Sequence, residues 1–242
     1  MQSYRFRRIG HLDLPGGGQV AVAGSTAFVG HMRPPLGTSL IDVSDPRRPR
    51  VVGEIRVPGS VHSHKVRPFG EGLIGVNHEL AKGMSGPMDP DLRILDVADP
   101  ARPMEVTFFR TGGIGVHRFD VDDRYAYLST EMDGYRGAIT VIVDLADPAR
   151  PREVARWWLP GQHTSGGETP SWEAKAHRTH HPLRLGDRLY ISCWYGGLAI
   201  VDITDLTRPE TMGRVGWTPP TRTPPTPPSR SRSRCPGGGG WR

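Results

Sequence analysis

The sequence contains no long apolar run and only two cysteines. A membrane-spanning helix needs roughly 18 or more consecutive apolar residues, and no segment approaches this, so we expect no membrane span. The basic N-terminal segment, residues 1–18, has no apolar stretch behind its arginines and does not resemble a secretory signal. Only Cys193 lies outside the C-terminal tail, so no disulfide framework is expected. These absences favour a cytoplasmic protein.

The charge of the chain does not indicate a nucleic-acid partner. The net charge is +6, but residues 218–242 contain five arginines and no acidic residue, which leaves +1 for the remainder. A nucleic-acid-binding domain usually carries a clustered basic face. We therefore expect no nucleic-acid binding by the folded part.

One phrase occurs four times, and such internal repeats define a fold. The copies run from Ile41 to Pro49, from Leu95 to Pro103, from Val143 to Pro151 and from Val201 to Pro209. Their first aspartates are 54, 48 and 58 residues apart. Each copy has a short apolar run, then an aspartate and a turn that usually contains Asp-Pro, and then a new alternating strand. The aspartates Asp42, Asp96, Asp144 and Asp202 are therefore interpreted as turn and capping residues.

Each interval also holds earlier short strands at Ala27–Val29, Leu73–Val76, Tyr125–Leu128 and Leu189–Ser192. Four strands per fifty or so residues is the period of a propeller blade, and abundant glycine (31) and proline (24) suit such an all-β chain. We predict a β-propeller over residues 19–217 with about four blades. Four blades is near the lower limit for a closed ring, so we expect a truncated form of a six- to eight-bladed propeller.

The repeated phrase resembles the LVIVD repeat of bacterial and archaeal proteins, over nearly all of residues 19–217. The resemblance implies a propeller fold and no particular activity, because propellers have many unrelated functions. A more distant similarity is to the selenium-binding protein and methanethiol oxidase group, whose propellers use histidines around a metal.

Residues 218–242 differ abruptly from the repeats, and two interpretations remain open. Low-complexity sequence of this kind is typical of a disordered linker. A single-base frameshift near Pro220 in a GC-rich gene would also produce it. One allowed back-translation, read in the restored frame, contains HTALPLP, which suits a further blade.

Histidines recur at one phase of the repeat. His64, His117 and His181 each precede an apolar position, Leu73, Ala126 or Tyr190, by nine residues, while the first blade has Gly18 there. The innermost strand of a blade comes early, so these side chains are expected to converge on the propeller axis. Neutral imidazoles brought together suit copper, zinc, iron or nickel.

Further residues near this phase complete the predicted metal site. His62 and His180 are additional candidate ligands. Residues that we expect to support the ligands by hydrogen bonds or carboxylate ligation are His177, His78, Glu79, Glu131 and Glu173. The alternative is that these histidines are polar strand residues bonded to backbone or water.

Other candidate sites are weaker. The run Gly16–Gly18 lacks the sequence context of a phosphate-binding loop. Cys193 is interpreted as a buried apolar residue, and Trp157, Trp158 and Trp172 as packing or channel-rim residues. Two functions therefore remain open: a metal-binding propeller, most plausibly an oxidoreductase, and a non-catalytic propeller that binds a protein or ligand.

Overall fold

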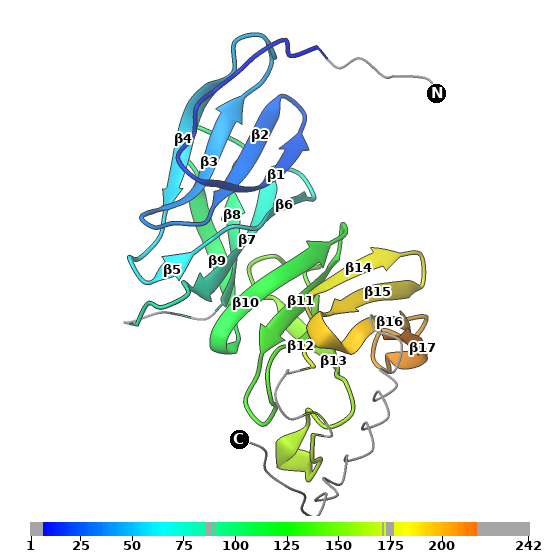
Figure 1. The fold of residues 1–242 in the computed structure, drawn as a ribbon. Coiled ribbons are helices and arrows are strands. Elements are labelled where there is room, and N and C mark those ends of the chain that lie inside the picture. Colours follow the sequence, from blue (N-terminus) through cyan, green and yellow to red (C-terminus); the bar gives the residue numbers. More distant parts are fainter. Residues whose placement is uncertain (1–6, 86–88, 90, 171, 173–176, 217–242) are drawn as a thin grey trace, which may run out of the picture.

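The computed structural model describes residues 7–85, 89, 91–170, 172 and 177–216. Within these residues the chain forms four blades of four antiparallel strands, which follow one another round an arc (Figure 1). Blade one (blue) and blade four (yellow to orange) form the two ends of the arc. This confirms the predicted all-β propeller fold, and the predicted tail, residues 218–242, lies outside the described residues.

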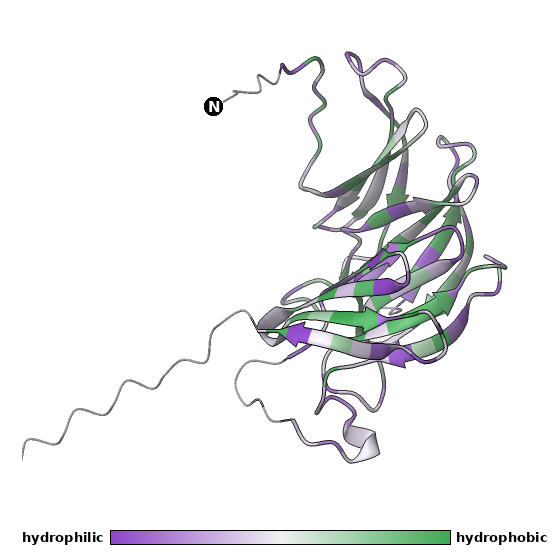
Figure 2. Cartoon of the chain, turned by 90° about the vertical axis from the view of Figure 1, so that its right-hand side faces the viewer, coloured by the Kyte–Doolittle hydropathy of each residue, from purple (hydrophilic) through white to green (hydrophobic). Residues whose placement is uncertain are grey.

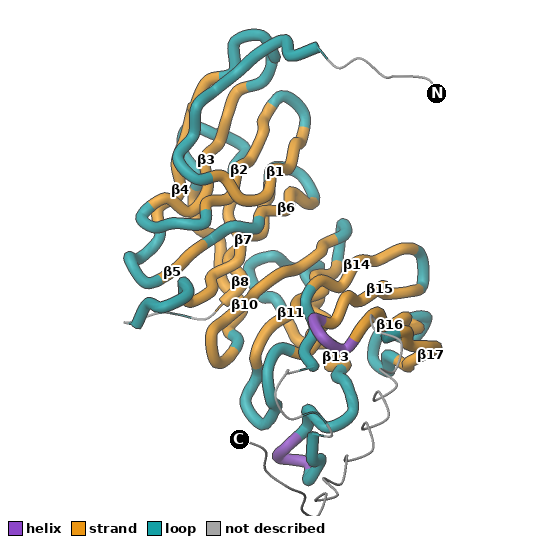
Figure 3. The backbone as a smooth tube through the Cα atoms, viewed as in Figure 1, coloured by secondary structure: helices purple, strands orange, loops and turns teal. Residues whose placement is uncertain are grey.

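The strands of the four blades alternate with turns and loops, and a long connection joins β13 to β14 (Figure 3). Blade one consists of β1 (Gly17–Ala23), β2 (Thr26–His31), β3 (Leu36–Asp42) and β4 (Arg50–Arg56). Blade two consists of β6 (Val66–Phe69), β7 (Leu73–Leu80), β8 (Asp91–Asp96) and β9 (Met104–Arg110), preceded by the short β5 (Val61–His62). Blade three consists of β10 (Gly112–Val121), β11 (Tyr125–Glu131), β12 (Ile139–Asp144) and β13 (Arg152–Trp157). Blade four consists of β14 (His181–Leu185), β15 (Arg188–Cys193), β16 (Gly197–Asp202) and β17 (Glu210–Val215). The two short 3-10 helices are η1 (Thr164–Gly166) and η2 (Trp194–Gly196).

The repeated aspartates form the turns that the sequence predicts. In each copy the first aspartate accepts a hydrogen bond from the backbone N–H two residues later, for example Ser44 N to Asp42 Oδ1 at 2.9 Å. The second aspartate does the same, as from Arg47 N to Asp45 Oδ1 at 3.0 Å. These local bonds close the hairpin between the third and fourth strands of every blade.

The core lies between neighbouring blades, and apolar residues concentrate along the strands (Figure 2). Leu40 of blade one packs in one cluster with Ile74 and Val76 of blade two. Leu128 belongs to the cluster between blades two and three, and Ile142 to the one between blades three and four. All five side chains are fully buried. Blade-to-blade packing therefore stabilises the fold and holds the innermost strands side by side.

The innermost strands are β1, β6, β10 and β14, and each contacts the next along the arc. One backbone pair also links two blades: Gly115 of β10 pairs with Glu79 of β7. Strand β10 thereby joins blades two and three into one continuous sheet. This junction positions the side chains described next.

Candidate metal centre

The strand registers align the blades residue by residue. Counting from the repeat aspartates, equivalent residues of the second strands are Asn77, Ser129 and Ser192. Their partners on the first strands are Lys65, Arg118 and His181. The preceding residues are then equivalent too, namely His64, His117 and His180.

The predicted phase is therefore wrong by one residue in blade four, where His180 rather than His181 is equivalent to His64 and His117. The nine-residue count matched Tyr190 with Ala126. The register instead pairs Leu189 with Val201, as Ala126 pairs with Val143, so Leu189 is the matching residue.

Blade one departs from the pattern for a steric reason. A Cβ atom on Gly18 would lie 2.8 Å from the carbonyl oxygen of His64 and 2.9 Å from that of Gly30. Real Cβ atoms essentially never approach backbone oxygens so closely. The contact between blades one and two thus excludes a histidine at this position.

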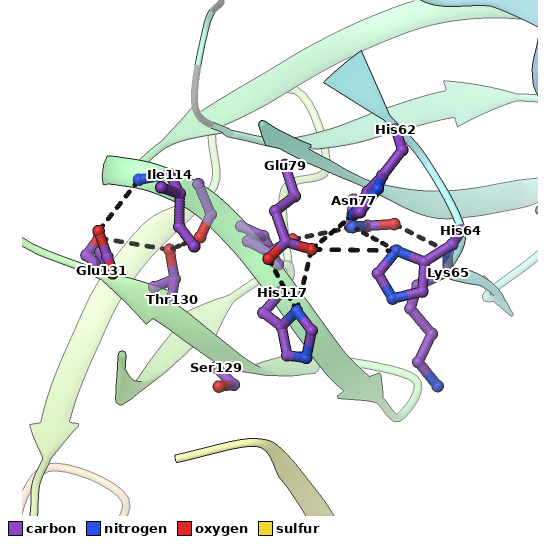
Figure 4. Close-up of polar contacts among 12 residues, drawn as sticks. His62, His64, Lys65, Asn77, Glu79, Ile114, His117, Ser129, Thr130 and Glu131 are labelled. Carbon is purple, nitrogen blue, oxygen red and sulfur yellow. Dashed lines mark hydrogen bonds and ion pairs between the residues drawn. The ribbon is translucent and has the colours of Figure 1, made fainter. Parts of the chain in front are cut away.

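Glu79 is the centre of the histidine group (Figure 4). Its Oε2 lies 2.8 Å from Nε2 of His62, and its two oxygens lie 2.8 and 2.9 Å from Nδ1 of His117. His64 is farther, with Nδ1 4.0 Å from Oε2. His62 comes from β5, Glu79 from β7 and His117 from β10, so the junction of blades two and three assembles the group.

Asn77 links this group to the next blade. Its Oδ1 accepts the backbone N–H of Lys65 at 2.8 Å, and its Nδ2 donates to the carbonyl of Val116 at 2.9 Å. The same Nδ2 lies 3.4 Å from Nδ1 of His64. Asn77 is fully buried, so it fixes the segment that carries His64 against β10.

Burial and hydrogen bonds together set the protonation states of His64 and Glu79. Burial, together with the nearby His62, lowers the pKa of His64 to about 3, so its imidazole is neutral at pH 7. Burial alone would raise the pKa of Glu79, but hydrogen bonds from His117 and His62 outweigh it and lower that pKa to about 2. A neutral imidazole beside an ionised carboxylate is the protonation state that metal ligands require.

The donor atoms of His62, His64 and Glu79 all lie within 4.8 Å of one another and are buried. Two ligands of a tetrahedral zinc ion are about 3.4 Å apart, from metal–ligand distances of about 2.1 Å. The present separations of 2.8 and 4.0 Å bracket that value. In addition, Nε2 of His117 is buried and has no hydrogen-bond partner within the described chain. The donor set therefore fits a metal ion.

His180 and His181 lie beside this group rather than in it. The ring of His180 is 5.0 Å from that of His117 and 4.9 Å from that of Trp194, centroid to centroid. The pKa of His180 is lowered to about 4, mainly by burial. Nε2 of His181 is buried and, within the described chain, has no partner.

The remaining predicted residues have other contacts. Nδ1 of His78 lies 3.4 Å from Asp91, because neighbouring strand residues point to opposite faces and Glu79 takes the site face. Glu131, equivalent to Glu79 in blade three, accepts the backbone N–H of Ile114 at 3.1 Å. His177 stacks on Trp172 at 5.6 Å. Glu173 lies outside the described residues.

The other candidate residues are structural. Cys193 is fully buried and burial raises its pKa to about 12. Trp157 is buried and donates to Thr211 at 3.0 Å, while Trp158 donates to Glu168 at 3.1 Å. The sequence analysis did not single out Asn77. Aligning the blades places Asn77 where blades three and four have Ser129 and Ser192, and its larger polar side chain could have drawn attention to it.

Comparisons with known proteins agree with this fold. The profile of the β-propeller domain family matches residues 39–118, and that of the LVIVD repeat matches residues 185–216. Among curated proteins, no sequence matches significantly. Together with the four blades, these matches define a β-propeller protein. The LVIVD match falls on strands β15 to β17 of blade four, so this blade is similar to an LVIVD repeat.

Solved structures share the fold at low sequence identity. The periplasmic gluconolactonase PpgL of Pseudomonas aeruginosa is 14% identical with a TM-score of 0.56, over 80% of this chain and 54% of that one. AztD of Citrobacter koseri is 13% identical with a TM-score of 0.51, over 84% and 47%. A hypothetical selenium-binding protein from Sulfolobus tokodaii is 13% identical over 77% and 51%, with a TM-score of 0.49. The chain thus spans about half the length of the structures it matches. In the described residues, no helix is long and apolar enough to cross a membrane.

Proposed function

We propose that this propeller binds a transition metal at the junction of blades two and three. His62, His64 and Glu79 are the proposed ligands, and His117 is the fourth candidate. The observation that carries the proposal is that the donor atoms of His62, His64 and Glu79 lie within 4.8 Å of one another in a buried position.

The donor set narrows the choice of metal. Two imidazoles and one carboxylate are used by zinc sites and by non-haem iron sites, and a set richer in histidine suits copper. We therefore propose zinc, iron or copper. Asn77 holds the segment of His64 in place, and Glu79 orients the rings of His62 and His117. The rings of His180 and Trp194 lie 5.0 and 5.9 Å from the ring of His117, centroid to centroid.

We further propose that the centre serves an oxidoreductase. A bound redox-active metal would supply an open position for a small substrate or dioxygen. The protein's own part is to keep the imidazole of His64 neutral by burial and the carboxylate of Glu79 ionised by hydrogen bonds.

The alternative is a non-catalytic scaffold, and one observation favours it. The carboxylate of Glu79 is already hydrogen-bonded by both His62 and His117, so this carboxylate has its polar partners without any ion. In that case the network would hold blades two and three together, and loops of the rigid propeller would bind the partner.

Metal content separates the two proposals. The full chain is purified without a metal-affinity tag, dialysed, and analysed by elemental mass spectrometry. Near-stoichiometric zinc, iron or copper is expected, with large losses in His62→Ala and Glu79→Ala. His11→Ala is the control, because His11 is half-exposed and far along the chain from the group. A folded protein without metal, or unchanged metal in both site variants, would favour the scaffold.

A further inference from the structure

A second set of side chains lies one residue beyond the histidines. The registers make Lys65, Arg118 and His181 equivalent in blades two, three and four. The innermost strands that carry them contact each other in turn, β6 with β10 and β10 with β14. The repeat therefore brings an ammonium, a guanidinium and an imidazole together at the inner edge of the blades.

These groups include two cations without a paired carboxylate in the described chain. Lys65 is only 2% exposed, and Figure 4 shows its side chain extending away from Glu79. Nε of Arg118 is buried and unpaired within the described chain. Buried polar groups normally have a partner, and buried charges are costly without one. An absent acceptor would account for the unpaired Nε of Arg118 beside the buried charge of Lys65.

The nearby carboxylates do not supply that acceptor. Asp120 pairs with Arg67 at 3.2 Å, and Glu79 is held by two histidines. In the described chain, neither Lys65 nor Arg118 forms an ion pair with a carboxylate. Besides burial, the positive charges of Arg118 and Arg67 act on Lys65 and lower its pKa, as expected for cations that lie close together.

We propose that Lys65 and Arg118 bind the oxyanion group of a small molecule, a carboxylate or a phosphate. The guanidinium of Arg118 offers parallel N–H donors that match two oxygens of one anion, and Lys65 adds a compact positive charge. The site does not depend on the proposed metal. It would nevertheless hold the acid group of a substrate one residue along the strand from the histidines.

The test uses the full chain after chelation, so that loss of a metal cannot be mistaken for loss of the anion site. Phosphate, sulfate and acetate are titrated separately by calorimetry at constant ionic strength in chloride. Binding of phosphate or acetate in the chelated protein is expected, and the preferred ion distinguishes a phosphate ligand from a carboxylate ligand. Because each charged hydrogen bond contributes about 1.5–3 kcal/mol, Lys65→Gln and Arg118→Gln should each weaken binding at least about tenfold.

Two variants make the outcome specific. Lys82→Gln removes an exposed lysine and should leave binding unchanged. Lys65→Arg keeps the charge and should retain most of the affinity, which covers the case in which Lys65→Gln fails to fold. The proposal is overturned if none of the three anions binds beyond chloride, or if Arg118→Gln binds like wild type. Binding that appears only after metal is added would also overturn it, because the anion would then be a metal ligand.

Discussion

Replacing Asn77 by alanine should weaken the junction between blades two and three. The amide of Asn77 bonds to the backbone on both sides, accepting from Lys65 at 2.8 Å and donating to Val116 at 2.9 Å. Alanine removes both bonds at a fully buried position, where water has no access to replace them. The N–H of Lys65 loses its acceptor and the carbonyl of Val116 loses a donor.

The expected cost follows from these two bonds. A buried backbone group left without a partner costs about 1–3 kcal/mol, so we expect a loss of about 2–4 kcal/mol in the free energy of unfolding. Asn77→Ser gives blade two the serine that blades three and four have at the equivalent position. Its hydroxyl is too short to span both contacts, so an intermediate loss is expected.

The assay is urea denaturation of the chelated protein at pH 7, followed by tryptophan fluorescence. Ser129→Ala is the matched control, because Ser129 is equivalent, equally buried, and makes one side-chain bond, to Thr179 at 3.0 Å. It should cost about 1 kcal/mol. If the two alanine variants agree within roughly 0.5 kcal/mol, the proposed bridge between the blades is refuted.

Three further predictions concern single residues. Hydrogen bonds from Ser44 and Arg50 lower the pKa of Asp42 from 3.8 to about 2, so its stabilisation is present above pH 3.8 and is lost as the pH falls towards 2. Between pH 4 and pH 2, the melting temperature of Asp42→Asn should therefore fall less than that of wild type. Buried Cys193 should resist alkylation by iodoacetamide at pH 8 until the chain is unfolded, as read by peptide mass spectrometry. Gly18→Ala should lower stability by about 1–3 kcal/mol in urea denaturation, because its Cβ meets two backbone oxygens.

Each of these has a control or a contradicting result. Gly213→Ala is the control for Gly18, because a Cβ on Gly213, also in a strand, meets nothing within 4 Å. Equal stability of the two glycine variants would contradict the close approach of His64. Rapid labelling of Cys193 in the folded protein would contradict its burial. Parallel acid transitions for wild type and Asp42→Asn would show that Asp42 does not contribute to the pH dependence.

The fold was predictable because its signals are local. Each repeat aspartate bonds to a backbone N–H two residues away, so the phrase alone predicts the turn wherever it occurs. The period of these turns then predicts four strands per blade. Nothing in that inference requires knowledge of how one blade meets the next.

The site was only partly predictable, because it depends on registers between distant segments. His62, His64 and His117 were predicted as ligands and lie round Glu79, but the central position of Glu79 follows from the pairing of β7 with β10, 36 residues later at Gly115. The sequence prediction assigned His181 instead of His180 to the repeated position, because the apolar positions used for counting were not equivalent across blades. The alternation of strand side chains could have shown that His78 and Glu79 do not share a face.

The pairing of Gly115 with Glu79 also bears on how the molecule comes apart. Repeat proteins unfold according to the strength of the interface between neighbouring units. Blades two and three share a continuous hydrogen-bonded sheet, whereas the sheets of blades one and four are separate. Amide protons of β7 and β10 should therefore exchange with solvent at one common rate, as a single cooperative unit. The histidine group lies at this junction, so we expect it to lose its structure together with β7 and β10.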